Sequence, residues 1–348
     1  MSRQPRHLSA LALAGLLWIL VNHSACAQTN WPNRLTLSGR MALGIRANFS
    51  AVPASAFSVA TRRTPQGAPY NYDDGYVLTD STGNAGGQTW YWGYDSPGQI
   101  SGNTILMDRS TLVGGTRVVT ADSAPNYGAD ILYSHPLYSR ADRTVGFEVG
   151  LSYLNVSFVN NDASTALAAT TTDAYGFTPG TTPPATPPSY QGAFNGPGFL
   201  LSASPSSSTS GRPGAVTSAG QRTCNADLFG FRVGPCLQFS LFDVPQLTLT
   251  LSGGFAAAWM QGTASWSEAA RLPSGAILNA AGQGNDSAFL MGGYLNGQIA
   301  YQFSPRWSVA AGAQFENLGS VSFPAGASNV QLQFGSIVYV NLGVGYSF

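Results

Sequence analysis

Residues 330–348 alternate between apolar and small or polar side chains. Steps of two backwards from the last residue give Phe348, Tyr346, Val344, Leu342, Val340 and Val338, all apolar or aromatic. A period of two is typical of a β-strand with one apolar face. Because chain termini normally fray in water, an apolar face that ends in aromatic residues at a terminus predicts contact with lipid.

Seven earlier stretches show the same alternation, which makes eight predicted strands. They are residues 35–49, 127–137, 144–158, 227–241, 246–262, 288–303 and 307–318. A tilted strand needs only about 9–11 residues to cross a bilayer. Short and long connections alternate along the chain, as they do between periplasmic turns and external loops. The pattern therefore predicts an all-β fold, a transmembrane antiparallel up-and-down β-barrel of eight strands with long extracellular loops and short periplasmic turns.

The long connections lack sustained alternation. Residues 50–125 are rich in Gly, Pro and Asp and predict a surface loop, although short apolar pieces at 104–107 and 117–120 leave a ten-stranded barrel as an alternative. Residues 159–226 are rich in Thr, Ser, Pro and Ala, a composition that buries too little apolar area to order itself and predicts a mobile loop. A third loop is expected at 263–287 and a shorter one at 319–329.

Composition supports a membrane barrel and excludes other classes. Only 9% of residues are charged, against about 25% in ordinary soluble domains. After the N-terminal segment no run of 18 apolar residues occurs, so helical membrane spans are not expected. The formal net charge is +0, which argues against a nucleic-acid partner. An all-β extracellular domain is the alternative.

Residues 1–27 predict a cleaved signal peptide, with Arg3 and Arg6 before an apolar stretch and Ala25-Cys26-Ala27 at the cleavage site. Residues 28–348 then form the barrel domain. A lipoprotein signal that retains Cys26 is the alternative, although His23 stands where such signals carry Leu. Cys224 and Cys236 remain; on one extended strand they would lie roughly 40 Å apart, too far for a disulfide. Whether they pair depends on how the preceding loop folds.

The C-terminal alternation resembles the signature of bacterial outer-membrane β-barrels, carried here by Val340, Leu342, Val344, Tyr346 and Phe348. In that family this stretch is the closing strand and the signal that the barrel assembly machinery recognises. The strand pattern is similar to small barrels of the OmpX, OmpW and OmpA-transmembrane type. The resemblance implies location in the bacterial outer membrane, with outer-membrane lipid and lipopolysaccharide as surroundings.

Six charged residues fall on the predicted inward faces: Arg40, Arg46, Asp130, Glu148, Arg232 and Glu316. An eight-stranded lumen is only wide enough for side chains to fill. Buried charges are costly unless they are paired, so three positive and three negative groups predict a neutralising lumen network. An ion pathway would favour one sign of charge and a wider bore.

Catalytic and metal chemistry find little support. After signal removal His135 is the remaining histidine, and it lies next to a predicted periplasmic turn. Outer-membrane enzymes of similar architecture use a histidine at the outer rim, so no enzyme activity and no cofactor are expected. One histidine and two separated cysteines make no zinc site. Asp80, Thr82 and Asn84 alternate like calcium ligands but lack the bidentate glutamate, so this is a weak calcium hypothesis.

An aromatic cluster, Trp90, Tyr91, Trp92 and Tyr94, marks the first loop. Such side chains could stack on sugars or anchor a partner; the favoured alternative is that they pack the loop against itself. The sequence thus predicts a structural or surface-interaction role (adhesion or binding) through external loops. A narrow porin or transport channel for small or hydrophobic solutes is the second hypothesis, and an outer-membrane enzyme is the third.

Overall fold

The computed structural model describes residues 32–59, 70–78, 86–122, 125–140, 143–184, 190–191, 198–242 and 244–348. These residues contain no α-helix, only two 3-10 turns, η1 (Ala54–Ala56) and η2 (Pro97–Gln99). None of their helices is long and apolar enough to cross a membrane. The predicted all-β, antiparallel character is confirmed. The predicted signal peptide lies outside the described residues.

The strands are numbered in chain order. They are β1 (Arg34–Leu43), β2 (Arg46–Phe49), β3 (Ser58–Val59), β4 (Tyr70–Asn71), β5 (Gly75–Val77), β6 (Gln88–Thr89), β7 (Trp92–Tyr94), β8 (Ile100–Ser101), β9 (Thr104–Gly114), β10 (Val119–Asp122), β11 (Asn126–Arg140), β12 (Arg143–Asn160), β13 (Ser164–Gly176), β14 (Tyr190–Gln191), β15 (Leu201–Ser202), β16 (Ser207–Ser210), β17 (Gly214–Leu241), β18 (Val244–Arg271), β19 (Ile277–Gln302), β20 (Trp307–Asn317), β21 (Ser320–Ala325), β22 (Ser328–Gln333) and β23 (Ile337–Ser347).

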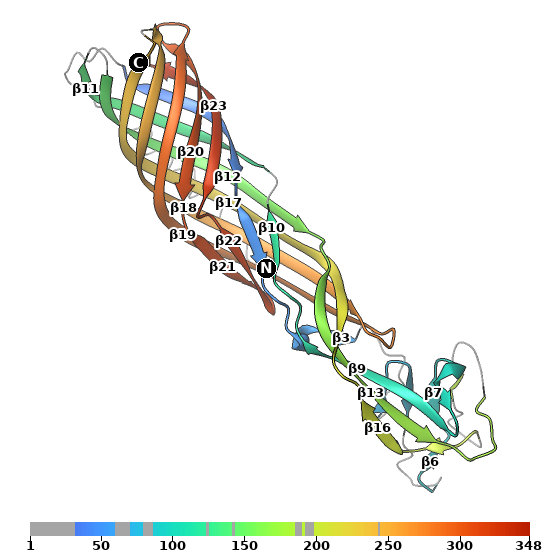
Figure 1. Cartoon of the computed structure of the whole chain (residues 1–348). Coiled ribbons are helices and arrows are strands. Elements are labelled where there is room, and N and C mark those ends of the chain that lie inside the picture. The colour runs from blue at the N-terminus through green and yellow to red at the C-terminus, as the bar shows by residue number, and fades with distance from the viewer. Residues whose placement is uncertain are drawn as a thin grey trace, which may run out of the picture.

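Eight of the described strands pair in a closed ring. The order is β1, β11, β12, β17, β18, β19, β20 and β23, and β23 pairs back with β1, all antiparallel. Three pairs of neighbouring ring strands, β11 with β12, β17 with β18, and β19 with β20, follow each other in the chain after at most four residues, and they meet at the end that also carries the C-terminus (Figure 1). Thr104–Gly114 and Val119–Asp122 are strands as well, but they pair outside this ring. Closure leaves no free sheet edge around the ring.

On the side of the ring away from the C-terminus, strands continue the barrel (Figure 1). We call this continuation the extension. Strands β12, β17, β18 and β19 run into it without interruption. The other four ring strands break and are continued by β10, β2, β22 and β21, which pair in a separate sheet. Between the two halves lies a large apolar core that includes Phe49, Leu154, Met260, Trp266 and Phe334. The extension therefore consists of two layers of strands with a filled apolar interior.

One of these breaks reverses the prediction for Arg46. Even-numbered residues of β1, such as Thr36 and Arg40, are buried, whereas beyond the break the odd-numbered Ala47 and Phe49 are buried. The break falls at Gly44, whose φ is +85° and where a Cβ would meet the Ser336 carbonyl oxygen at 2.8 Å. A shift of one residue exchanges the faces of a strand. Arg46 consequently points outward, and the prediction that it lies in the lumen is wrong.

The strands are longer than the alternation predicted. Strand β17 begins at Gly214, and β18 and β19 form one long hairpin through the turn 272–276. The prediction of a loop at 263–287 is therefore wrong. Residues 330–348 are two strands, β22 and β23, separated by 334–336. Most outward side chains in the extension are polar or small, so the contrast in hydrophobicity between the two faces fades there although the strands continue.

The two long predicted loops fold together into a head, which comprises the described parts of 70–114 and 164–210. Strand β13 pairs with β9, β16 and the first residues of β17, and β7 joins β5 and β14 in a small sheet. The head lies at the end of the molecule opposite the C-terminus (Figure 1). Predicting both segments as loops, the second mobile, was wrong because the two segments share one apolar core. Tyr72, Trp92 and Tyr94 of the first segment pack with Tyr175, Phe177 and Leu201 of the second.

Candidate functional site

Five of the six predicted lumen charges lie together inside the ring. We call Arg40, Asp130, Glu148, Arg232 and Glu316 the lumen network; all are buried, with at most 6% of any residue exposed. They come from β1, β11, β12, β17 and β20. Ser252, Tyr294 and Tyr339, from the remaining three ring strands, contact these residues. All eight strands thus contribute a side chain at one level.

Arg232 and Asp130 form the centre of the lumen network. Arg232 Nη1 and Nη2 donate to the two carboxylate oxygens of Asp130 at 2.7 and 2.8 Å. Such bidentate pairs are stronger and more directional than single hydrogen bonds. Gly150, paired opposite Arg232, makes room for the guanidinium, since a Cβ there would meet it at 2.9 Å. The glycine is therefore required by the close approach of the arginine.

The other members surround this pair. Arg40 lies 3.8 Å from both Asp130 and Glu316, and its guanidinium stacks 3.5 Å above the Tyr339 ring. Glu148 accepts hydrogen bonds from Ser252 at 2.7 Å and Tyr294 at 3.0 Å. Sequence analysis missed the two tyrosines, because a lone tyrosine on an inward face carries no charge to single it out. Stacked and hydrogen-bonded groups of this kind leave little freedom for the charges to separate.

The lumen is filled on both sides of the network. Toward the C-terminal end, a cavity lined by Arg34, His135 and Cys236 among others has a volume of about 10 Å³. That is space for about one water molecule. Toward the head lies the apolar core of the extension, where Met260, Leu332 and Phe334 are fully buried. Among the described residues, buried side chains therefore occupy the lumen on both sides of the network.

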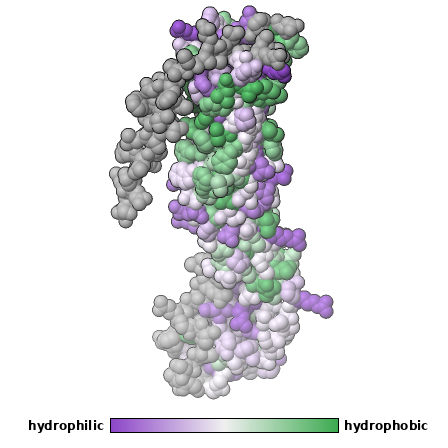
Figure 2. Space-filling model, turned by 90° about the vertical axis from the view of Figure 1, so that its left-hand side faces the viewer, coloured by the Kyte–Doolittle hydropathy of each residue, from purple (hydrophilic) through white to green (hydrophobic). Residues whose placement is uncertain are grey.

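The outside of the ring carries an exposed apolar belt. Its most exposed members include Leu295 at 66%, Leu342 at 65% and Met291 at 64%. Figure 2 shows hydrophobic residues gathered around this part, while polar colours prevail toward the head. Along β19 and the residue after it, the belt runs from Phe289 to Phe303, 14 residue steps, or about 46 Å at roughly 3.3 Å per step. At a tilt of about 40° this is about 35 Å of height, close to a hydrocarbon core with its aromatic borders.

Aromatic residues border the belt at both ends. Toward the head, one cross-strand row contains Tyr153, Phe229, Trp259 and Phe289, which we call the aromatic row. At the opposite end Tyr346 contacts the rings of Trp307 and Phe348 at centroid distances of 5.0 and 6.2 Å. One step beyond the aromatic row the outward residues turn polar: Asn155, Asp227, Gln261 and Ser287. Such an abrupt change is typical of a membrane–water interface.

The predicted C-terminal signal residues lie on the belt. Val340, Leu342 and Val344 are exposed on β23, which pairs with both β1 and β20. Phe348 is 53% exposed, and its backbone N–H donates to the Asn33 carbonyl at 2.9 Å. The final residue is thereby attached to the start of β1, at the seam where the ring closes.

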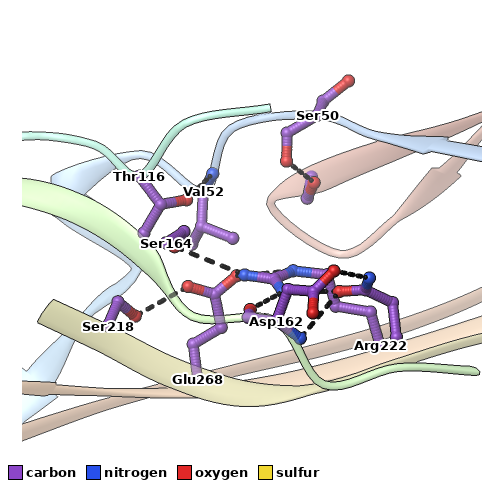
Figure 3. Close-up of polar contacts among 10 residues, drawn as sticks. Ser50, Val52, Thr116, Asp162, Ser164, Ser218, Arg222 and Glu268 are labelled. Carbon is purple, nitrogen blue, oxygen red and sulfur yellow. Dashed lines mark hydrogen bonds and ion pairs between the residues drawn. The ribbon is translucent and has the colours of Figure 1, made fainter. Parts of the chain in front are cut away.

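A buried ion pair, Arg222 with Glu268, joins β17 and β18 near the start of β13 (Figure 3). Arg222 Nη2 and Nε donate to Glu268 Oε1 at 2.6 and 3.1 Å. Arg222 also donates hydrogen bonds to three groups around the start of β13: Asn160 Oδ1 at 3.3 Å, the Asp162 carbonyl at 3.0 Å and Ser164 Oγ at 3.4 Å. Glu268 in turn accepts a hydrogen bond from Ser218 on β17 at 2.8 Å. Because both charges are almost fully paired, the geometry favours a structural connection between barrel and head.

The four aromatic residues predicted as a recognition cluster, Trp90, Tyr91, Trp92 and Tyr94, differ in burial. Trp92 and Tyr94 are buried in the core of the head, where Trp92 donates to the Phe199 carbonyl at 2.9 Å and Tyr94 to the Pro184 carbonyl at 2.7 Å. Their rings stack at a centroid distance of 5.7 Å. Trp90 and Tyr91 are half-buried. For Trp92 and Tyr94 the recognition hypothesis is corrected: they hold the head together.

Two carboxylates protect the edge of β9 in the head. Asp74 Oδ1 accepts the backbone N–H of Asp108 at 2.8 Å, and Asp73 Oδ2 accepts that of Ser110 at 2.6 Å. The pKa of Asp74 is raised to about 7, chiefly by burial and also by the nearby Asp108 and Asp73 carboxylates, while the hydrogen bond from the Asp108 N–H acts in the opposite direction. Since the unfolded value is about 3.9, the folded head binds the extra proton between these pH values.

We expect the stability of the head to fall as pH rises from about 4 to 7, because there the unfolded chain has lost the proton that folded Asp74 keeps, and to level off above that range, where both states have lost it. Asp74→Asn keeps the oxygen acceptor and should remove this dependence. Limited proteolysis of the head at pH 5 and pH 8 measures it. Asp122→Asn, at an exposed carboxyl, is the control. An unchanged pH slope in Asp74→Asn would contradict the assignment.

The remaining predicted residues divide as follows. His135 Nδ1 lies 2.7 Å from Asn33 Oδ1 at the C-terminal end of the barrel, and Cys224 and Cys236 are both buried and unpaired with each other. Asp80, Thr82 and Asn84 lie outside the described residues. Within the described part of the chain, no group of three or more His, Cys, Asp or Glu could hold a metal ion.

The geometry defines a class: a closed antiparallel β-barrel with a filled lumen and a head at one end. No family model matches the chain, and no curated protein matches it. Among solved structures, the outer membrane protease OmpT from Escherichia coli is 10% identical with a TM-score of 0.36, covering 93% of this chain and 99% of that one.

Two further solved structures show lower scores. The transport unit of the autotransporter AIDA-I from Escherichia coli is 10% identical with a TM-score of 0.21 and full coverage, 100% of each chain. The P. putida toluene transporter TodX is 8% identical with a TM-score of 0.19, covering 91% of this chain and 90% of that one. At these scores the assignment of the class rests on the strand pairing alone.

Proposed function

We propose that this protein is an integral bacterial outer-membrane β-barrel whose lumen is permanently closed and whose role is to hold a folded head above the cell surface for binding or adhesion. The observation that carries the proposal is the combination of an exposed apolar belt with a filled interior. A belt of this height bordered by aromatic rows fits a bilayer. Eight strands cross it, and the extension and head stand outside.

The closed lumen argues against the channel hypothesis. A pore needs a continuous water-filled or apolar path, whereas here the lumen network spans all eight strands and the core of the extension lies directly above it. Opening the path would separate buried ion pairs, which is strongly unfavourable. The interior serves as a rigid plug that fixes the barrel's shape.

Orientation follows from the positions of the ends. Short connections and the C-terminus lie together, as periplasmic turns do in barrels of this kind, so the head faces outward. Val340, Leu342, Val344, Tyr346 and Phe348 then present the closing strand to the barrel assembly machinery, and outer-membrane lipid and lipopolysaccharide surround the belt.

Two single cysteine variants test this arrangement in intact cells. Thr209→Cys lies on the exposed strand β16 of the head, and Arg306→Cys lies in the exposed turn between β19 and β20. We expect a membrane-impermeant maleimide to label Thr209→Cys in intact cells and Arg306→Cys only after the outer membrane is permeabilised. The buried Cys224 and Cys236 provide the unlabelled background.

The opposite labelling pattern would contradict the orientation. Labelling of both sites in intact cells, together with release of the protein without detergent, would contradict membrane insertion itself.

A further inference from the structure

The outer face of the extension formed by β12, β17, β18 and β19 has a chemistry distinct from the rest of the surface. Beyond the aromatic row it presents mainly hydroxyl, amide and alanine side chains in successive cross-strand rows, with the exposed Val159 on the outermost strand, β12. The charged residue nearest the row, Asp227, accepts hydrogen bonds from Tyr153 at 2.7 Å and Asn155 at 2.8 Å. The opposite outer face, by contrast, carries the exposed Arg46–Asp122 ion pair.

Two grooves lie on this neutral face, one after the other along the same strands. The lower groove has a volume of about 490 Å³ and is lined by residues that include Thr223, Asn225, Thr263, Ser265, Gln283 and Asn285. The upper groove has a volume of about 500 Å³ and includes Ser58, Ala219, Ser267, Ala269, Asn279 and Ala281. Glu268 also lines it, but its buried carboxylate is neutralised by Arg222. From Thr263 to Ala269 on β18 they form a track of about 20 Å at roughly 3.4 Å per residue.

The side chains on the track exclude most ligand classes. Nucleic acids and phosphates require Arg or Lys, and cations require several carboxylates. Protein partners rely on aromatic or apolar anchors in the centre of the interface. The track has instead small floor residues and a rim of hydroxyl and amide groups, each able to donate or accept a hydrogen bond. That combination suits a neutral chain rich in hydroxyl groups.

We propose that this track binds the neutral oligosaccharide of an outer-leaflet glycolipid, lying against the barrel as it rises from the membrane. The inference rests on the proposed membrane position, because the track starts a few residues above the aromatic row and leads toward the head. A lipid-anchored glycan starts at the same level and extends in the same direction. Tethering in the same membrane supplies the high effective concentration that weak hydrogen-bonded contacts need.

Cysteine accessibility in nanodiscs tests the proposal. Ser265→Cys lies in the lower groove, and Ser322→Cys lies on β21, outside both grooves. The Pro324 carbonyl of β21 lies against Gly284, which pairs with Ala264, so the two sites stand at similar height. The discs contain either lipopolysaccharide with its full glycan or the same glycolipid cut back to its acylated disaccharide.

If the glycan occupies the track four-fifths of the time, the cysteine is free to react for only one-fifth of the time. We therefore expect maleimide labelling of Ser265→Cys to be roughly fivefold slower in full-glycan discs, with little change in the labelling rate of Ser322→Cys. Equal slowing at both sites would indicate general shielding, and no slowing at either would indicate an empty track; each overturns the proposal. Protection that follows protein density in both kinds of disc would indicate a second copy and would also overturn it. These outcomes leave the cellular labelling of Thr209→Cys and Arg306→Cys as a separate test of the membrane arrangement.

Discussion

Replacing Arg232 by alanine is expected to lower the free energy of unfolding by about 3–5 kcal/mol, because it leaves a buried carboxylate without its partner. Asp130 would lose both of its short hydrogen bonds, at 2.7 and 2.8 Å, and keep only Arg40 at 3.8 Å. The measurement is equilibrium unfolding in urea of the barrel folded into lipid vesicles, followed by tryptophan fluorescence.

The matched control is Arg46→Ala. Arg46 also pairs with an aspartate, at 2.9 Å, but the two side chains are 60% and 76% exposed. A solvent-exposed pair contributes less than about 1 kcal/mol. A double change, Arg232→Met with Asp130→Leu, removes both charges and should recover much of the loss. Equal small losses in Arg232→Ala and Arg46→Ala would contradict a closed, low-dielectric lumen.

Replacing Leu295 by arginine is expected to cost about 2–4 kcal/mol, the penalty for a charged side chain near the middle of a bilayer. Leu295 faces outward on β19, and it lies near the midpoint between the aromatic borders Phe289 and Phe303. Its unfolding in lipid vesicles, compared with the wild-type chain, provides the value.

Ser287→Arg is the control on the same strand. Ser287 also faces outward, eight residues away and beyond the aromatic row. A surface substitution there should change stability by no more than about 0.5 kcal/mol. If the two variants lost equal stability, the belt would not be in contact with hydrocarbon.

Alternation predicted strands well where the two faces differ in hydrophobicity. Inside the belt, outward side chains are apolar and inward ones polar, so even single residues such as Glu148 and Arg232 were assigned to the lumen face. In the extension this contrast is reversed and weakened: Trp266 faces inward, whereas Thr263 and Ser265 face outward. The period of two continues there, and the buried Ala264, Trp266 and Glu268 were the available signal.

Two features could not be derived from local sequence. The break at Gly44, which moves Arg46 outward, depends on the close approach of Ser336, nearly three hundred residues away. The head depends on pairing between β9 and β13, with Leu106 opposite Ala174. Each partner alone has the composition of a loop, and only their mutual burial, with Trp92 and Tyr94 between them, orders both. Long-range pairing of this kind produces no regular alternation of apolar and polar residues in either segment.

The central claim, a membrane barrel with a closed lumen, is tested most directly by single-channel recording in planar bilayers. Insertion is verified in the same preparation by the heat-dependent gel mobility of the folded barrel. The account predicts a silent protein, with no discrete conductance steps, because the lumen network and the core of the extension both block the axis. Reproducible, stepwise conductance from the folded wild-type chain would contradict it.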